Sequence, residues 1–410
     1  MKIWMKFLLG ALLGICLGFL LPDDNETIRN ILVWFEALSI RIGRYTLAPI
    51  LIFSLIIALY ELQQDGHFWK LFFSSFLVII GSGVFVIAVG IIVTLVFPPA
   101  RIPILVEEQV ESISLYLPES VMELFPSNAF SVLINEGVFL LPMAVFVFFF
   151  AIGLSYDRNY TKPVIAMVDS LSRIFYYAAS FFSEILGVVI IALSAYWAFR
   201  YHVVLRANMF RDLIVLLGLL SGILGFVILP LFLFFLKPKT NPLVAVYGSL
   251  GPALAAFFSG DINFTLPVML RHAKENLGAR RRSNVVTVTL FSIFGRAGSA
   301  MVATIAFIVI IRSYSSLGIT LADVFSIGIR ALLISFALFQ HPGKGAYTTL
   351  AILSIGYGRG FEAGYLILKP LAFYLIAVGT FLDVMIMSLA TYALAKINGF
   401  QVEKGPRHFI

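Results

Sequence analysis

The sequence predicts an all-helical protein that crosses a lipid bilayer several times. Of its 410 residues, 60% are hydrophobic and only 12% are charged, and the mean hydropathy is +0.98. A water-soluble core of this length could not cover so much apolar surface, so lipid is the solvent for most of these side chains. Stretches of roughly 20 residues with few or no charges, long enough to span hydrocarbon as a helix, recur along the chain. Examples are residues 7–21, 76–97, 138–154, 213–236 and the run that ends at 302–311.

The basic residues do not form a nucleic-acid surface. The net charge of +7 comes from 29 Lys and Arg against 22 Asp and Glu, but the basic residues cluster between apolar segments, where they orient a membrane protein. We therefore expect a lipid bilayer and a small solute as partners, and no nucleic acid. The single cysteine, Cys16, excludes an intramolecular disulfide.

The N-terminal segment imitates a secretory signal because Lys2 and Lys6 precede an apolar run. It lacks the small residues of a cleavage site, so we predict an uncleaved first helix. The two lysines place the N-terminus in the cytoplasm.

The charges of the later loops give one orientation. The acidic loops 22–27 and 107–120 are predicted outside, and the loop 156–162 is predicted inside. The basic loop 200–212 falls outside in this assignment and is the one that disagrees with it.

Two apolar segments are predicted to enter and leave the membrane on the same side. The first lies between the basic loops 237–239 and 271–282, and residues 259–267 at its middle read SGDINFTLP, a turn sequence. The second contains QHPGKG at residues 340–345 and must fold back because the last helix, about 361–394, leads to a basic cytoplasmic tail.

The predicted fold is therefore about eight transmembrane helices and two oppositely oriented re-entrant helical hairpins. Opposed hairpins are typical of inverted repeats, and broken helices that meet near the midplane form the substrate site of secondary transporters. The organisation alone predicts a transporter and not an enzyme.

Several segments resemble the dicarboxylate/amino acid:cation symporters, the family of the glutamate transporters. The most specific is FTLPVMLRHAKENLG (264–278), which is similar to the exit of that family's first hairpin, and the P-G-x-G of the second hairpin matches residues 342–345. The resemblance implies a homotrimer whose transport domain carries solute across like an elevator. It implies scaffold helices at 1–69 and 101–209, a transport domain built from 70–100 and 210–396, and a cytoplasmic tail at 397–410.

The motifs that bind substrate and sodium in that family differ here. The hairpin tip S-S-S-G-T reads DINFT at residues 261–265, and N-M-D-G-T of the seventh helix reads GRAGS at 295–299. A gap-free match of the eighth helix gives Gly379 for the substrate-carboxylate arginine, Ile376 for the amine-binding aspartate, Thr380 for the threonine, Asp383 for an asparagine and Met387 for a sodium-binding aspartate. A match with a gap would instead align Asp383 with the sodium-binding aspartate, and it requires a bulge in the helix.

Arg296 is the most informative of these departures. An arginine at bilayer depth costs about 2.5 kcal/mol or more, so it needs a partner or a wet cavity, and it stays charged at ordinary pH. We predict that its guanidinium replaces a bound cation, contacts the carbonyls of a broken helix and pairs with Asp383. The alternative is a side chain that reaches up to the membrane interface.

Other polar residues complete the predicted site. Asp261 could bind an amine, accept a coupling proton or cap a half-helix, and Ser299 and Thr380 match hydroxyl positions of the family or bond their own helices. His341 and Lys344 could attract an anion or belong to a solvated loop. The predicted substrate-binding residues are Asp261, Asn263, Ser299, Gln340, His341, Lys344, Gly345, Thr380 and Asp383.

The sequence thus predicts a carrier of small carboxylates or amino-acid-like solutes in the plasma or inner membrane, with both termini cytoplasmic. No cofactor and no metal site is predicted. Sodium or proton coupling stays open, and an anion channel is a further alternative. An intramembrane protease is disfavoured because its G-x-G-D motif would fall on residues 258–261, where Phe258 replaces the first glycine. A zinc hydrolase is disfavoured because the histidines lack H-E-x-x-H spacing.

Overall fold

The computed structural model describes the chain except for residues 23–24, 104–121, 123, 135–139, 207–208, 237–240, 315–318, 339–342, 359, 406 and 408. The described residues are almost entirely helical and contain no β-strand, only an isolated bridge between Ala279 and Gln401. The helices of the N-terminal half are α1 (Ile3–Leu20), α2 (Glu26–Arg44), α3 (Leu47–Gln64), α4 (Phe68–Val96), α6 (Ser131–Ile134), α7 (Leu140–Tyr156) and α8 (Arg158–Arg206).

The C-terminal half is built from shorter and more often interrupted helices. They are α9 (Arg211–Ile223), the π-helical turn η1 (Leu224–Ile228), α10 (Leu229–Leu236), α11 (Pro242–Ser259), α12 (Ile262–Glu275), α13 (Arg281–Phe294), α14 (Ala297–Tyr314), α15 (Leu321–Ser335), α16 (Gly345–Tyr357), the 3₁₀ segment η3 (Gly364–Leu371) and α17 (Ala372–Ile397).

Eight helical segments among the described residues are long and apolar enough to cross a membrane, which confirms the prediction of a polytopic membrane protein. One of the eight is α11, which the sequence assigned to the first hairpin. The segments differ in how far the protein encloses them: the most apolar window is 94% buried in the α13–α14 segment, against 33% in α4. The window in the segment that contains α17 is 78% buried, so α13, α14 and α17 form the centre of the fold and the more exposed helices surround them.

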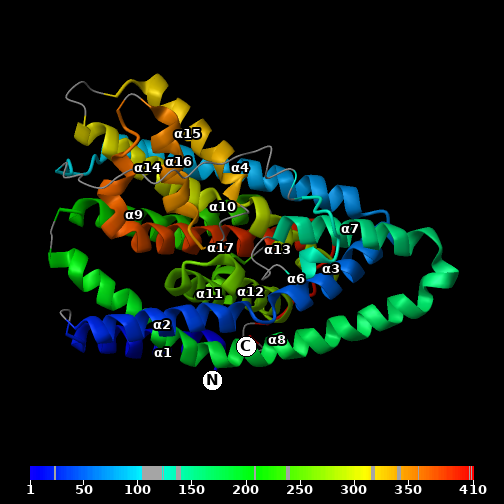
Figure 1. Cartoon of the computed structure of the whole chain (residues 1–410). Helices are drawn as coiled ribbons and strands as arrows, with labels where there is room; N and C mark the ends of the chain where they lie inside the picture. The colour runs from blue at the N-terminus through cyan, green and yellow to red at the C-terminus, as the bar shows by residue number, and fades with distance from the viewer. Residues whose placement is uncertain are drawn as a thin grey trace.

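The long helix α8 lies with α1 and α2 along one edge of the molecule (Figure 1). Glycines spaced four residues apart allow α1 to approach it closely. A Cβ at Gly14 would lie 2.0 Å from Ser194 Oγ, and one at Gly10 would lie 2.4 Å from the carbonyl oxygen of Gly187. Small residues at this spacing let two membrane helices bring their backbones together.

The first predicted hairpin is a helix-turn-helix. Helix α11 ends at Gly260, which has a left-handed φ of 61°, and α12 begins directly after Asp261. The two helices pack against each other in opposite directions, since Asn276, just after α12, donates to the carbonyl of Gly248 near the start of α11. The chain therefore reverses at the SGDINFTLP segment, where the turn residues predicted a reversal.

The second predicted hairpin consists of α15 and α16. Both helices pack against α14 and against each other, at the upper left of Figure 1. The residues between them at 339–342 lie outside the described part of the chain.

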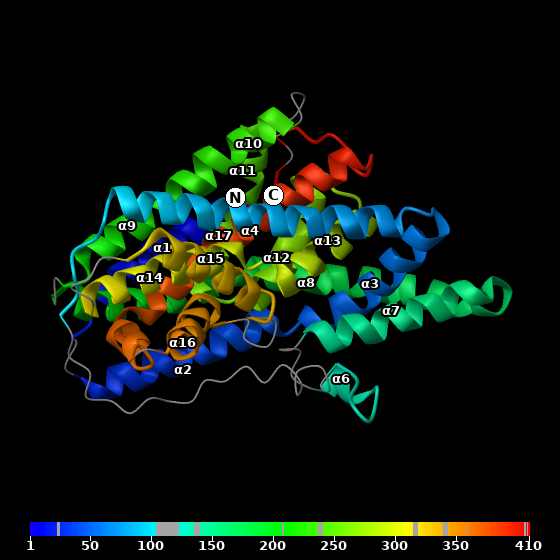
Figure 2. The same ribbon diagram turned by 90° about the horizontal axis from the view of Figure 1, so that it is seen from above.

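The two chain termini meet at the base of the first hairpin. Lys2 Nζ donates to Tyr247 Oη at 2.9 Å, the Tyr247 ring stacks on Phe409, and the amide of Ile410 donates to Asn276 Oδ1 at 3.0 Å. Figure 2 shows the two ends close together. The sequence placed both termini and both flanks of this hairpin on one side of the membrane, and these contacts agree with a common side.

Candidate functional site

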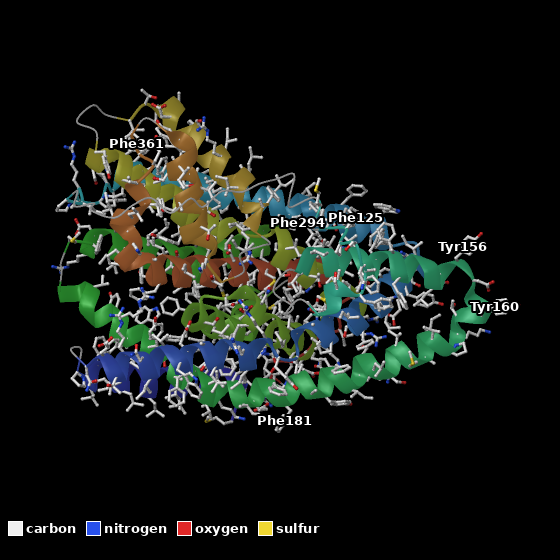
Figure 3. The ribbon with its side chains drawn as sticks, viewed as in Figure 1. Phe125, Tyr156, Tyr160, Phe181, Phe294 and Phe361 are labelled. Carbon is white, nitrogen blue, oxygen red and sulfur yellow. The ribbon has the colours of Figure 1, made fainter. Side chains whose placement is uncertain are left out.

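Three interruptions of regular structure come together beside the middle of α17, inside the helical body. They are the turn at Gly260 and Asp261, the break between α13 and α14 at Gly295 and Arg296, and the start of α16 at Gly345. In Figure 3, Phe294, the last residue before the helix break, lies between Phe361 at one end of the body and Tyr156 at the other. The helix break therefore lies in the middle part of the molecule in this view (Figure 3).

Asp383 of α17 caps α14 from a neighbouring helix. The broken helix leaves N–H groups without intrahelical acceptors. Asp383 Oδ1 accepts from the amides of Gly298 at 2.6 Å and Ser299 at 3.1 Å, and its Oδ2 accepts from Ser299 Oγ at 2.6 Å. A carboxylate is well suited to this position because the helix N-terminus is electropositive. Both oxygens of Asp383 are thus engaged, and the side chain is fully buried.

Arg296 occupies the break itself and is among the largest fully buried side chains, with 1% of its surface exposed. The carboxylates of Asp383 and Asp261 act electrostatically on its guanidinium. The protein encloses this side chain, whereas the alternative prediction required it to reach the membrane interface. The structure therefore brings Arg296 and Asp383 into one buried cluster.

Asp261 divides its two oxygens between two tasks. Oδ1 accepts from the amides of Asn263 at 2.8 Å and Phe264 at 3.1 Å, so it caps α12 as the capping alternative predicted. Oδ2 forms an ion pair with Arg44, the last residue of α2. The cap therefore leaves one carboxylate oxygen available to a cation.

Glycines bring the start of the second hairpin's return helix against the other elements. A Cβ at Gly343 would lie 3.2 Å from Asp261 Oδ2, and one at Gly345 would lie 2.8 Å from Ser299 Oγ. A Cβ at Gly379 would lie 3.1 Å from both the Cβ of Ala346 and the Cα of Ser299. Close backbone approach at these positions needs residues without side chains.

Helix α17 also contacts the first hairpin tip directly. Thr380 Oγ1 donates to the carbonyl of Gly260 at 3.2 Å, and a Cβ at Gly260 would lie 2.8 Å from Ile376 Cγ2. The helix is continuous from Ala372 to Ile397. The interruption on this side of the fold is instead the π-helical turn η1.

Most of the predicted residues converge, but not all of them. The cluster contains Asp261, Asn263, Arg296, Ser299, Gly345, Thr380 and Asp383, and every one of these is buried. Lys344 lies at the second tip with an exposed side chain, and Gln340 and His341 fall outside the described residues. Among the side chains that the structure describes, no three of His, Cys, Asp or Glu gather as a metal-binding group.

Arg44 is the residue of this cluster that the sequence analysis missed. It lies inside an apolar span of 39 residues, Glu26–Gln64, and only part of its side chain, 22%, is exposed. A basic residue in the middle of such a span is a recognisable signal, because charges there need a partner.

Comparison with known proteins places this arrangement in a family. The model of the sodium:dicarboxylate symporter family matches residues 3–402, which is nearly the whole chain. A search of individually curated proteins gives no match.

Proposed function

Because this chain belongs to the sodium:dicarboxylate symporter family, we propose that it is an elevator-type carrier of small carboxylates or amino-acid-like solutes in which Arg296 replaces a bound cation. The family and the membrane-capable helices make it a multi-pass membrane transporter of the symporter type. The proposal adds the electrostatic role of Arg296, the class of solute and the mode of movement.

The enclosed guanidinium carries the proposal. Arg296 is 1% exposed at the break between α13 and α14, where the carboxylates of Asp383 and Asp261 attract its guanidinium. A guanidinium remains protonated at any physiological pH, so it supplies a permanent positive charge at this point. A sodium ion supplies such a charge only while it is bound.

The hydrogen bonds of Asp383 support the same reading. Its oxygens accept from Gly298 and Ser299 and so stabilise the start of α14. The alignment offers Met387 where the family has a second acidic ligand, and Met387 is fully buried. The nearby charge that balances Asp383 is then Arg296.

The elevator movement, a homotrimer and a plasma or inner membrane location with cytoplasmic termini belong to this proposal. They are supported by the two hairpins that meet at the site and by the basic hairpin base, where both chain ends are bound. Basic loops mark the cytoplasmic side of membrane proteins.

A sodium- or proton-coupled dicarboxylate symporter is the second candidate, because the matched family is described by sodium and dicarboxylate. Uptake of labelled succinate and L-aspartate into proteoliposomes, with sodium or choline as the external cation, separates the two. We expect saturable uptake that is the same in both cations. Uptake that sodium stimulates would favour the second candidate.

A further inference from the structure

Arg44 connects the candidate site to a helix outside both hairpins. It ends α2, which continues after Tyr45 and Thr46 into α3, and α2 packs mainly against α8. Its guanidinium nevertheless reaches the tip of the first hairpin and pairs with Asp261, whose side chain is only 3% exposed. An arginine from α2, a helix that packs mainly on α8, therefore reaches the polar cluster at the tip of the first hairpin.

Close packing fixes Arg44 in this position. The neighbouring Gly43 is buried, and a Cβ there would lie 2.0 Å from Cδ2 of Phe264 in α12. The Phe264 ring is fully buried against the backbone of α2. Arg44 thus starts from a backbone that already touches the hairpin, so its side chain is held beside the tip.

The guanidinium has more donors than the hairpin uses. Arginine presents several N–H groups in a planar fork, and here Nη2 donates to Asp261. Nε is buried and has no hydrogen-bond acceptor among the described residues. A buried donor without an acceptor is costly, and the fork geometry suits a second carboxylate bound through two parallel hydrogen bonds.

The charges around the two hairpin tips do not cancel one another. Counted with the neighbouring Glu36 and Arg200, the charged side chains here are four cations (Arg44, Arg200, Arg296 and Lys344) and three anions (Glu36, Asp261 and Asp383), so these described side chains have one positive charge in excess. Gly343 lies next to the pair, since a Cβ there would be 3.6 Å from Arg44 Nη2. The second tip therefore borders the guanidinium with a residue that has no side chain.

From these observations we propose that Arg44 binds a carboxylate group of the transported solute and so determines the specificity of the carrier for acidic solutes. The inference rests on the proposed function and deepens it. It assigns carboxylate recognition to α2, because Gly379 on α17 has no side chain to supply it. Arg44 can contact the solute only while the tip of the first hairpin lies against α2. It therefore contributes to affinity only in that arrangement of α2 and the hairpin.

Binding measurements on the purified full-length protein test this role. The probes are succinate and L-aspartate, measured by isothermal titration calorimetry. We expect Arg44→Met to weaken succinate binding about tenfold or more, the effect of losing a charge-assisted pair. Arg44→Lys keeps the charge but loses the fork and should be intermediate. Arg41→Met, an exposed arginine one turn earlier on α2, is the matched control and should bind like the wild type.

Combining Arg44→Met with Asp261→Asn shows whether Arg44 binds the solute or only anchors Asp261. Asp261→Asn removes the partner of Arg44 but keeps the cap, since asparagine also caps helices. If Arg44 contacts the solute, Arg44→Met weakens binding further in the Asp261→Asn background. If Arg44 only anchors Asp261, the double variant binds like Asp261→Asn, and the proposal is overturned. Thermal unfolding of each ligand-free variant shows whether it is folded.

Two further outcomes are distinct. Succinate binding by Arg44→Met that equals the wild type overturns the role of Arg44 and leaves the proposed function intact, because the solute is then bound without this guanidinium. A wild-type protein that binds neither succinate nor L-aspartate contradicts the proposed function itself and removes the carboxylate role with it.

Discussion

Asp383 and Asp261 perform the same local task in very different surroundings. Each accepts two backbone N–H bonds at the start of a helix, α14 for Asp383 and α12 for Asp261. The second oxygen of Asp383 is taken by a hydroxyl in a fully buried cluster, whereas that of Asp261 is taken by a partly exposed arginine. Both oxygens of Asp383 therefore stabilise the fold, whereas Asp261 has one oxygen whose partner, Arg44, can be replaced by another cation.

The largest expected loss of stability follows substitution of Asp383. Asp383→Ala removes the acceptor of three N–H and O–H donors and leaves the Arg296 charge less balanced. Leaving buried donors without an acceptor in this way costs about 1–3 kcal/mol for each group. We expect a sharply lower thermal unfolding temperature in detergent. An unchanged unfolding temperature would contradict the capping role.

Overpacking at the tip contacts should have a smaller effect. Gly379→Ala places a methyl group 3.1 Å from Ala346 and Ser299, so the second hairpin must shift, at a cost of about 1–3 kcal/mol. Gly222→Ala is the control, because a Cβ there meets nothing within 4 Å. We expect lower stability and slower uptake for Gly379→Ala alone. Equal behaviour of both variants would show that the tip contact does not restrict the site.

The smallest expected change in stability follows substitution of Asp261. Asp261→Asn keeps a capping side chain and loses an ion pair whose carboxylate is buried but whose arginine is 22% exposed, so solvent can still reach the unpaired guanidinium and the cost stays below the value of about 3–5 kcal/mol for a fully enclosed pair. The unfolding temperature should therefore stay close to that of the wild type, while solute binding changes. A loss of stability as large as that of Asp383→Ala would remove the difference between the two residues.

Long-range contacts explain what the sequence could and could not predict. Apolar runs and loop charges are local properties, and they predicted the membrane helices and the reversal at Gly260. The convergence of Asp261, Ser299, Thr380 and Asp383 followed from family motifs. The pairing of Arg44 with Asp261 joins residues 217 positions apart, and no local pattern encodes such a partner. Lys344 was predicted as a site residue or a solvated rim, and its exposed side chain fits the second description.

The helix break at Arg296 shows a similar limit. The sequence predicted that Arg296 contacts a broken helix, but not the residues at which the helix breaks. In the structure α13 ends at Phe294 and α14 starts at Ala297, which places the guanidinium in the gap. The cap on that second helix start comes from Asp383, 84 positions away from Ser299 in the chain.

The sodium dependence of uptake by the wild type and by Arg296→Met tests the central claim most directly. Both proteins are reconstituted in liposomes, and labelled succinate and L-aspartate uptake is measured with sodium or choline outside. Our account predicts that wild-type uptake is equal in the two cations and that Arg296→Met loses about tenfold or more of its uptake in choline. Sodium-stimulated, electrogenic uptake by the wild type would contradict it.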